Sequence, residues 1–258
     1  MKTFSSFIVS ILLIGAVGCA PNSYQLKKTI EGDPSIVFVA IEKDPTKFIE
    51  VVNKAAQEAQ KGQATKAQED EQKSREEEFK NPLKPVIDEN RVMQGPKDAN
   101  VTIVEYTDFE CPYCSRGFQT IKQVLKQYPK DVRVLIKHLP LDFHPKAMPA
   151  AKYFEALRMQ SNSMALKFYD ELFLNQETLK LKGEDFMKSV AKKLGANMQE
   201  LSKNLSNVKI QQLIEADIEE AQRFGISGTP GYIINGVSLK GAYPAEEFKK
   251  IVDKHLRK

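Results

Sequence analysis

Cys111-Pro112-Tyr113-Cys114 is the stretch that decides the fold of this chain. It follows an apolar segment, residues 101–107, that predicts a strand, and it opens a segment, residues 115–128, that predicts a helix. Two thiols three residues apart at the start of a helix lie on one face, within bonding reach of each other. The helix N-terminus favours a thiolate there, and the thiolate is the form that attacks disulfides. The pattern therefore favours thiol–disulfide exchange over a purely structural role.

The beginning of the chain predicts an export signal over residues 1–18. Lys2 gives a positive start, and residues 7–17 are largely apolar but well short of the ~20 residues that span a membrane. The run Ala16-Val17-Gly18-Cys19 resembles the lipobox of bacterial lipoproteins, with Ala16 where that family most often has Leu. Cys19 is therefore expected to be lipidated after cleavage, and the alternative is an ordinary signal that happens to contain a cysteine.

Charge and cysteine content narrow the class of protein. The 258 residues carry a net charge of +4 with no basic face, so no nucleic-acid partner is expected. Once Cys19 is lipidated or removed, Cys111 and Cys114 are the only thiols, which excludes a disulfide-stapled scaffold. The pair could instead be half of a zinc site, but there is no second such motif and only three histidines. No metal site is predicted.

Residues 19–85 are interpreted as the lipid-attachment cysteine, a helical extension and a polar linker. Two Asp-Pro pairs, at 33–34 and 44–45, predict short helices near 23–30 and 34–42 and a long helix from residue 45. Residues 36–39 are β-branched enough to form a strand instead. Residues 64–80 are almost wholly polar and predict a solvated spacer. The apolar part, residues 23–60, either packs on its own domain or forms a surface for a homo-oligomer.

The second domain is expected to span residues 86–258. The strand at 101–107, the helix and a second strand at 132–137 predict a parallel pair with a right-handed crossover. Helical patterning then fills an insertion of about residues 141–225. A hairpin with an Asn235-Gly236 turn and a last helix from Pro244 complete the domain.

This order of elements, with Gly228-Thr229-Pro230 ahead of the hairpin, resembles the thioredoxin fold. The helical insertion makes the chain similar to the DsbA-like family of thiol–disulfide oxidoreductases, over residues 86–258. Supporting motifs are Asp108-Phe109-Glu110, residues 137–141 and residues 225–230. The predicted class is α/β, a thioredoxin fold with a helical insertion, preceded by an α-helical N-terminal extension.

The resemblance implies a role for each residue of the motif. Cys111 would be the exposed nucleophile, with a pKa in the range of roughly 3.5–7.5, and Cys114 the resolving thiol. Pro112 and Tyr113 would tune the redox poise, and the redox-active disulfide Cys111–Cys114 needs no further cofactor. Thr229-Pro230 is expected to be cis and to lie against the pair, with the backbone of Thr229 pairing with the substrate strand.

Glu105 and Lys137 are the predicted proton-transfer residues. Glu105 lies six residues before Cys111 in an otherwise apolar strand, and Lys137 ends the neighbouring strand. A buried acid there resembles the family residue that moves protons to and from the resolving cysteine, and burial beside a cation would let it serve as a base for Cys114. The alternative is a surface pair at the strand ends. His138 and His144 are interpreted as structural.

The sequence thus predicts an exported thiol–disulfide oxidoreductase, lipid-anchored and facing the periplasm of a bacterial envelope. It would act on cysteines of exported proteins through a Cys111 mixed disulfide and exchange electrons with a membrane or envelope redox partner. The direction of electron flow stays open: the extension and the Cys-Pro-Tyr-Cys with Thr229 are similar in kind to ScsC and DsbG proteins, whereas the insertion is shared by oxidases. Alternatives are a thioredoxin-like copper carrier with Cys111 and Cys114 as soft ligands, and a chaperone-like envelope lipoprotein.

Overall fold

The computed structural model describes residues 22–91 and 93–257, so the predicted signal peptide and Cys19 lie outside the described residues. The chain divides into two compact units at Gln68 and Glu69. Within the described part of the chain, no helix combines the length and apolar character needed to cross a membrane.

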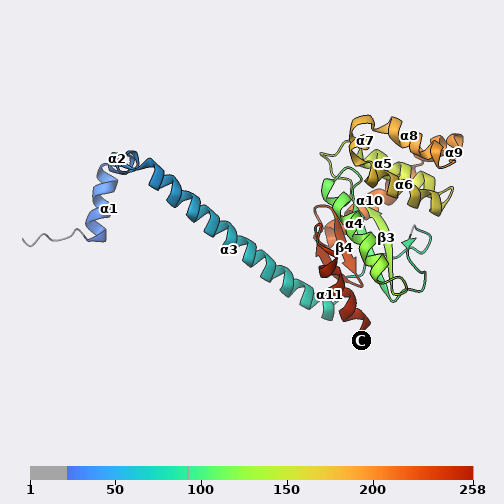
Figure 1. The fold of residues 1–258 in the computed structure, drawn as a ribbon, viewed down its shortest axis with the longest axis horizontal. Helices are drawn as coiled ribbons and strands as arrows, with labels where there is room; N and C mark the ends of the chain where they lie inside the picture. Colours follow the sequence, from blue (N-terminus) through green and yellow to red (C-terminus); the bar gives the residue numbers. More distant parts are fainter. Residues whose placement is uncertain (1–21, 92, 258) are drawn as a thin grey trace, which may run out of the picture. The chain divides into compact units, whose positions relative to one another are not determined.

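The first unit is helical, as predicted. It contains α1 (Ser23–Gly32), α2 (Ser35–Lys43) and the first part of α3 (Pro45–Lys80) (Figure 1). Carboxylate and amide oxygens cap the starts: the side chain of Asn22 accepts from the Gln25 N–H at 2.9 Å, and that of Asp44 from the Lys47 N–H at 2.9 Å. The β-branched residues 36–39 lie in α2, so the strand alternative for them is wrong.

The second unit is built on a five-stranded sheet in the order β1-β3-β2-β4-β5. The strands are β1 (Met93–Gln94), β2 (Val101–Thr107), β3 (Val132–His138), β4 (Gly231–Ile234) and β5 (Val237–Lys240). β2 and β3 are parallel and joined through α4 (Pro112–Gln127), while β4 is antiparallel to β2 and to β5. This is the predicted thioredoxin arrangement, with the hairpin turning at Asn235-Gly236, both at positive φ.

Helices fill the predicted insertion between β3 and β4. They are α5 (Ala147–Arg158), α6 (Asn162–Leu174), α7 (Gln176–Lys182), α8 (Glu184–Lys193), α9 (Met198–Leu205) and α10 (Val208–Arg223). The helices α5 to α9 gather together in Figure 1, and the last helix of the chain is α11 (Ala245–Leu256). Phe109, in the loop after β2, packs among aromatic rings of the insertion, and this cluster joins the insertion to the sheet.

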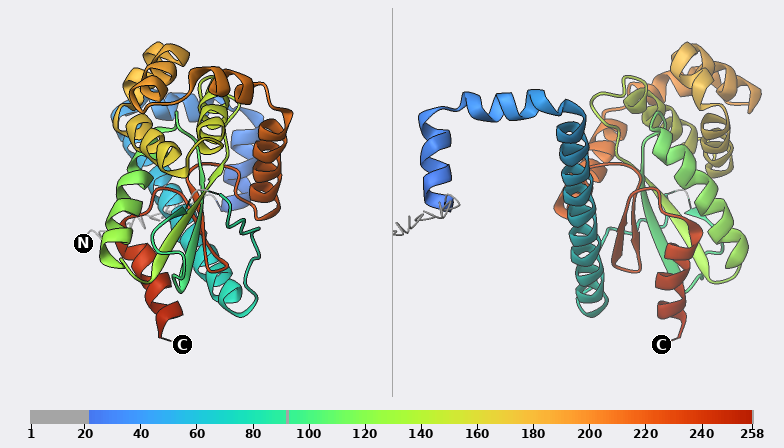
Figure 2. Two further views of the ribbon diagram at one scale, coloured as in Figure 1. Left: turned by 90° about the vertical axis from the view of Figure 1, so that its right-hand side faces the viewer. Right: turned by 60° about the vertical axis from the view of Figure 1, so that its left-hand side comes forward.

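Alternation along the strands assigns each side chain to one of two faces of the sheet. Val101 and Ile103 of β2 pack in one core with residues of α4 and α11, whereas Val104 and Tyr106 pack in another with Ala221 of α10. Figure 2 shows the strands of this unit enclosed by its helices. The two faces of β2 therefore have different neighbours, and Glu105 shares its face with Val101 and Ile103.

The boundary expected at residues 85–86 is wrong, because the second unit already begins at Glu69. The last turns of α3 belong to it: Glu71 accepts from the Tyr243 hydroxyl at 2.6 Å, and Arg75 pairs with Glu247 at 3.2 Å. Glu78 accepts from the backbone N–H and the hydroxyl of Ser238, at 2.7 and 2.9 Å. The polar composition of this segment therefore marks hydrogen bonding to β5 and α11 rather than a solvated spacer.

Candidate active site

The two cysteines lie at the N-terminus of α4. Cys111 is the N-cap residue and Pro112 opens the helix, where a missing N–H leaves no bond unmade. Both are free thiols, and a hydrogen bond joins their side chains. The backbone N–H of Asp108 also donates to the Cys114 sulfur at 3.4 Å. The structure thus brings the predicted nucleophile and resolving thiol together.

Cys111 is not exposed, contrary to the prediction. Only 3% of its surface is accessible, whereas the neighbouring Tyr113 is 55% exposed. The reason is the loop ahead of β4, whose Thr229 carbonyl oxygen lies 3.5 Å from the Cys111 sulfur. A substrate must therefore approach along this loop rather than from open solvent.

The environment separates the two thiols strongly in pKa. The pKa of Cys111 is lowered to about 5, first by the hydrogen bond from the Cys114 side chain, against the opposing effect of burial. Thr229 and the backbone N–H groups of Cys114 and Tyr113 lower it further. Burial raises the pKa of Cys114 well above its usual value, and the neighbouring Cys111 adds to that shift. At neutral pH one thiolate therefore faces one thiol.

The peptide bond between Thr229 and Pro230 is cis, as predicted. This peptide bond lies against the cysteine pair, since the carbonyl oxygen of Thr229 contacts the Cys111 sulfur. The side chain of Thr229 also lowers the pKa of both cysteines. A groove of about 300 Å³ opens beside this loop, with Tyr113, Arg116 and Thr229 in its lining.

Two residues outside the predicted site hold the loop ahead of the cysteines. The buried carboxylate of Asp108 accepts from the backbone N–H of Glu110 at 2.7 Å and of Cys111 at 3.2 Å, and its other oxygen lies 2.8 Å from Nδ1 of His144. Gln176 at the start of α7 donates to the carbonyl oxygens of Phe109 and Cys111 at 2.9 and 2.8 Å. The helical insertion thus holds the backbone at Cys111, and His144 contacts the carboxylate of Asp108 in the same loop.

Glu105 lies on the same face of the sheet as α4 and is completely buried. Burial raises the pKa of its carboxyl to about 7, although a hydrogen bond from the Tyr169 hydroxyl at 2.8 Å opposes the shift. A group with this pKa exchanges protons at neutral pH, which suits acid–base work.

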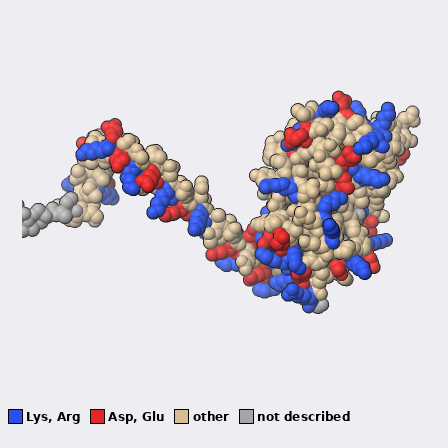
Figure 3. All heavy atoms as spheres, viewed as in Figure 1, with Lys and Arg blue, Asp and Glu red and all other residues tan. Residues whose placement is uncertain are grey.

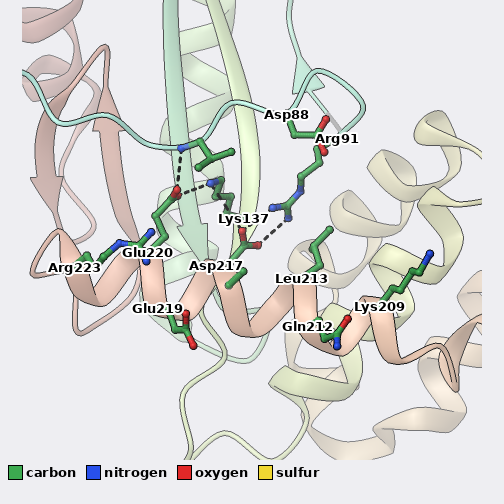
Figure 4. A pocket seen from close by; sticks show the side chains of 12 residues that line it. Asp88, Arg91, Lys137, Lys209, Gln212, Leu213, Asp217, Glu219, Glu220 and Arg223 are labelled. Atoms are coloured by element: carbon green, nitrogen blue, oxygen red, sulfur yellow. Dashed lines mark hydrogen bonds and ion pairs between the residues drawn. The ribbon is translucent and has the colours of Figure 1, made fainter.

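Lys137 is not beside Glu105, contrary to the prediction. In the parallel pairing Glu105 stands opposite Ile136, and Lys137 stands opposite Tyr106, whose side chain is on the other face. Lys137 instead pairs with Glu220 of α10 and lies 3.9 Å from Asp217 (Figure 4). The predicted acid–cation pair therefore does not form, because a one-residue offset sends two strand side chains to opposite faces.

The pairs around Lys137 form a buried network on that far face. Asp217 accepts from Arg91 at 2.6 and 2.8 Å, and Glu220 accepts from the backbone N–H of Val86 at 2.8 Å. They line a cavity of about 440 Å³ between α10 and the segment ahead of β1, drawn in Figure 4. Arg91 and Lys137 are each paired with an acid of α10, so we infer that the network packs α10 against the sheet.

Sequence reasoning also missed two buried tyrosines that lie near Glu105. The Tyr169 hydroxyl bonds to Glu105, and burial raises the pKa of Tyr232 well above its usual value, with Glu105 and both cysteines close enough to add to the shift. Among the described residues, no hydrogen-bond partner lies within reach of the Tyr232 hydroxyl. Both tyrosines sit at apolar positions of their periodic patterns, so their signal was that of ordinary core residues.

In the described ranges, no three side chains among His, Cys, Asp and Glu gather in a way that could hold a metal ion. The hydroxyl groups of Tyr169 and Tyr232 lie near enough to both Cys114 and Glu105 for the charges of these groups to raise the tyrosine pKa values.

Comparison with known proteins identifies the fold family. A family model described as thioredoxin matches residues 87–254. The Na(+)/H(+) antiporter NhaA 3 of Salinispora tropica is 32% identical over 169 residues, which are 65% of this chain and 25% of that protein. The chain spans about a quarter of the length of the curated relatives it matches.

Solved structures give the same result. The catalytic domain of ScsC from Proteus mirabilis is 26% identical, with a TM-score of 0.57, over 66% of this chain and 92% of that one. The thiol-disulfide exchange protein α-DsbA2 from Wolbachia pipientis is 20% identical, with a TM-score of 0.59, over 73% of this chain and 97% of that one. Since the family model covers more than half of its length, this protein belongs to the thioredoxin family.

Proposed function

We propose that the protein is a thiol–disulfide oxidoreductase that acts on cysteines of exported proteins. The observation that carries the proposal is the difference in pKa between two adjacent thiols, with Cys111 lowered to about 5 and Cys114 raised. A thiolate next to a protonated partner can attack a disulfide while the partner waits to resolve the product. The named thiol-disulfide exchange protein among the similar structures adds support.

The reaction runs in two exchanges. The Cys111 thiolate attacks one sulfur of a substrate disulfide, forms a mixed disulfide and releases the other sulfur as a thiolate. Cys114 then loses its proton and attacks the Cys111 sulfur, which frees the second substrate thiolate and leaves the Cys111–Cys114 disulfide. Two electrons pass from the protein to the substrate, and the reverse sequence donates the disulfide.

Glu105 is the proposed acceptor of the Cys114 proton. Its pKa of about 7 lies between that of an ordinary carboxyl group and that of an ordinary thiol, so it can accept a proton and release it again at neutral pH. Tyr169 and Tyr232 both lie close enough to Glu105 and Cys114 to feel their charges, which supports a buried path among these groups.

The direction of electron flow follows from the reduction potential. The lowered pKa of Cys111 stabilises the reduced pair at neutral pH, and this favours donation of the disulfide. Equilibration of the protein with glutathione buffers measures the potential. A strongly oxidising value supports an oxidase, and a more reducing value together with an oligomer supports an isomerase or reductase.

Trapping of a mixed disulfide tests the function itself. The Cys114→Ser variant should accumulate a covalent adduct with a disulfide-containing protein, because the resolving thiol is gone. The adduct should disappear on adding dithiothreitol, and Cys111→Ser should form none. If Cys114→Ser forms no adduct while its Cys111 still reacts with iodoacetamide, the protein does not act on protein disulfides.

We further propose that the chain is exported and anchored by a lipid on Cys19, facing the periplasm, where it meets its substrates and a membrane or envelope redox partner. The pattern at residues 16–19 supports this. Labelling of cells with a radioactive fatty acid should mark the protein, and Cys19→Ser should abolish the label. Unlabelled but cleaved protein would indicate an ordinary signal peptide instead.

A homo-oligomer through residues 23–60 completes the proposal. The three helices of the first unit have no buried residue among those described, and large apolar side chains stand exposed on them. The α2 helix is apolar on most of its surface, and such a helix is normally covered. A second copy of the same segment offers an apolar surface of matching kind.

A further inference from the structure

We propose that the groove beside Thr229 selects substrate polypeptides that carry a carboxylate side chain next to the reactive cysteine. This inference rests on the proposed oxidoreductase function and names the substrates that the site prefers. It follows from the position of the groove, from the charge of its lining and from the partners of the acids beside Tyr243.

The groove lies where the residue adjacent to the attacked cysteine must pass. Thr229 lines it, and the carbonyl oxygen of the same residue is 3.5 Å from the Cys111 sulfur. A chain residue spans about 3.3 Å when extended, so a neighbour of the substrate cysteine reaches the groove while the sulfurs are in contact. Its volume of about 300 Å³ is enough for one side chain.

The charged residues in the groove lining are both cations. Arg116 and Lys240 line it, and no Asp or Glu does. Both are exposed, and neither is paired with an acid among the described residues. On the surface drawn in Figure 3, by contrast, charges of both signs are interspersed, as a net charge of +4 implies. The groove is therefore a local positive site on a mixed surface.

Arg116 is placed to receive a carboxylate. Its guanidinium carbon lies 4.5 Å from the ring centre of Tyr113, which is itself 55% exposed, so the ring supports the side chain without satisfying its N–H groups. A guanidinium binds a carboxylate through two parallel hydrogen bonds, a geometry that an amide or an ammonium does not reproduce.

The end of α3 contacts Tyr243, which lines the groove, and the two acids at this contact already have partners. The Tyr243 hydroxyl donates to Glu71 at 2.6 Å, and the Arg75 guanidinium lies 5.5 Å from the Tyr243 ring centre. Arg75 pairs with both Glu71 and Glu247, at 2.9 and 3.2 Å. Lys250 also pairs with Glu247, at 2.5 Å, so two cations balance these two carboxylates. Neither carboxylate is paired with Arg116 or Lys240 of the groove.

Peptide disulfides of controlled charge test the inference. We would prepare three symmetric disulfides of one short peptide whose single cysteine is flanked by Glu, by Gln or by Lys, and measure their reduction by the reduced full-length protein. Reduction of the same peptides by dithiothreitol corrects for the effect of flanking charge on the sulfur itself. The corrected rate for the Glu peptide should exceed that for the Lys peptide by roughly threefold to tenfold at low ionic strength, and the ratio should shrink with salt.

Two variants identify the source of the preference. The double variant Arg116→Gln/Lys240→Gln should bring the corrected Glu-to-Lys ratio close to 1. Lys126→Gln, which removes an exposed cation from the other end of the same helix, should leave the ratio unchanged. The ratio is the informative quantity, because a general change in Cys111 reactivity alters all three peptides alike.

The outcomes separate this inference from the function on which it rests. Reduction of all three peptides with equal corrected rates would overturn the acidic preference and leave the oxidoreductase standing. A preference that persists in the double variant would also overturn it, since the charge would then act elsewhere. Failure of the reduced protein to reduce any of the peptides, together with failure of its oxidised form to oxidise the same peptides as thiols, would count against the oxidoreductase itself.

Discussion

The carboxyl group of Glu105 titrates near neutrality because burial outweighs the hydrogen bond that Tyr169 donates to it. Its pKa of about 7 lies above the ordinary value of 4.5, so the folded state binds this proton more tightly than the unfolded state. The contribution to stability is therefore complete below pH 4.5 and is lost as the pH rises through 7. A shift of this size corresponds to about 3 kcal/mol.

The Glu105→Gln variant should not lose that stability. Its side chain is neutral at every pH, so its free energy of unfolding should stay level between pH 5 and pH 8.5, where that of the parent falls by up to about 3 kcal/mol. Denaturant unfolding of the oxidised proteins measures this, because the disulfide keeps both thiols from titrating. An equal fall in parent and variant would show that Glu105 is ionised in the folded state at low pH.

The same substitution should alter the resolving step. In the parent, release of the second substrate thiol should accelerate as the pH rises through about 7, when Glu105 becomes a base. Glu105→Gln should lose this inflection and slow the step by roughly 10²-fold at neutral pH. Lys137→Met is the matched control: it removes the other predicted proton-transfer residue, which faces Glu220 on the far side of the sheet, so the inflection should remain.

At the scale of elements, α4 approaches the loop of Pro230 and strand β4 closely through Gly117. A Cβ atom built at Gly117 would collide with the Tyr232 hydroxyl and lie 3.1 Å from Cγ of Pro230. Glycine is thus required here by the close approach of two elements, and the contact fixes the depth at which the cysteines sit over the sheet.

Gly117→Ala should therefore destabilise the protein by about 1–3 kcal/mol, the usual result of overpacking. Removing the Tyr232 hydroxyl should restore part of the lost stability. The double variant Gly117→Ala/Tyr232→Phe should therefore lose less free energy of unfolding than the two single variants lose together. Thermal unfolding of the four proteins gives the coupling. Additive effects would show that the Pro230 ring, rather than the Tyr232 hydroxyl, excludes a side chain.

Most of these elements could be predicted because each has a local signal. Apolar segments marked β2 and β3, Asn235-Gly236 marked the hairpin turn, and the Asp-Pro pairs marked helix starts. The site was harder, because Tyr169 comes from the insertion and meets Glu105 only in the folded chain. Such a contact has no signal along the sequence, and its tyrosine fits an apolar periodicity.

The prediction for Lys137 was wrong because adjacency of strands was taken as adjacency of side chains. Register and alternation together decide the face, and here they place Lys137 with Tyr106. The domain boundary was wrong for a related reason. Polar residues at the end of α3 were read as solvated, yet the carboxylates there accept hydrogen bonds from Ser238 of β5 and from Tyr243 in the loop ahead of α11.

Glu78→Ala tests whether the end of α3 is part of the second unit. The substitution removes both acceptors of Ser238, whose backbone N–H is buried, and should cost about 1–3 kcal/mol of stability. Glu76→Ala, on an exposed turn of the same helix, removes the same charge and should change stability by less than about 0.5 kcal/mol. Equal losses of stability in the two variants would show that the end of α3 is a solvated spacer, as the sequence predicted.

At the scale of the whole molecule, the chain joins one unit that has a buried core to another whose described residues have none. The second unit contains the aromatic and aliphatic cores and the cysteine pair. In the first unit, Phe38 is 64% exposed, Val39 52% and Ile49 54%. Isolated helices as short as α1 and α2 are marginal in water, and a surface that covers them would stabilise them.

If that surface is a second copy of the chain, a charge in α2 should disperse the assembly. Phe38→Glu is expected to convert the oligomer to a monomer in sedimentation experiments, because each interface would bury an unpaired carboxylate. Leu181→Glu is the matched control, since Leu181 is 84% exposed but lies on α7 of the other unit, and it should leave the assembly intact. Neither substitution touches the cysteine pair, so reduction of a small peptide disulfide should proceed at the parent rate. If the parent protein sediments as a monomer, a different partner must cover the apolar helices. Binding of the parent to lipid vesicles, with loss of this binding in Phe38→Glu, would identify a membrane surface as that partner.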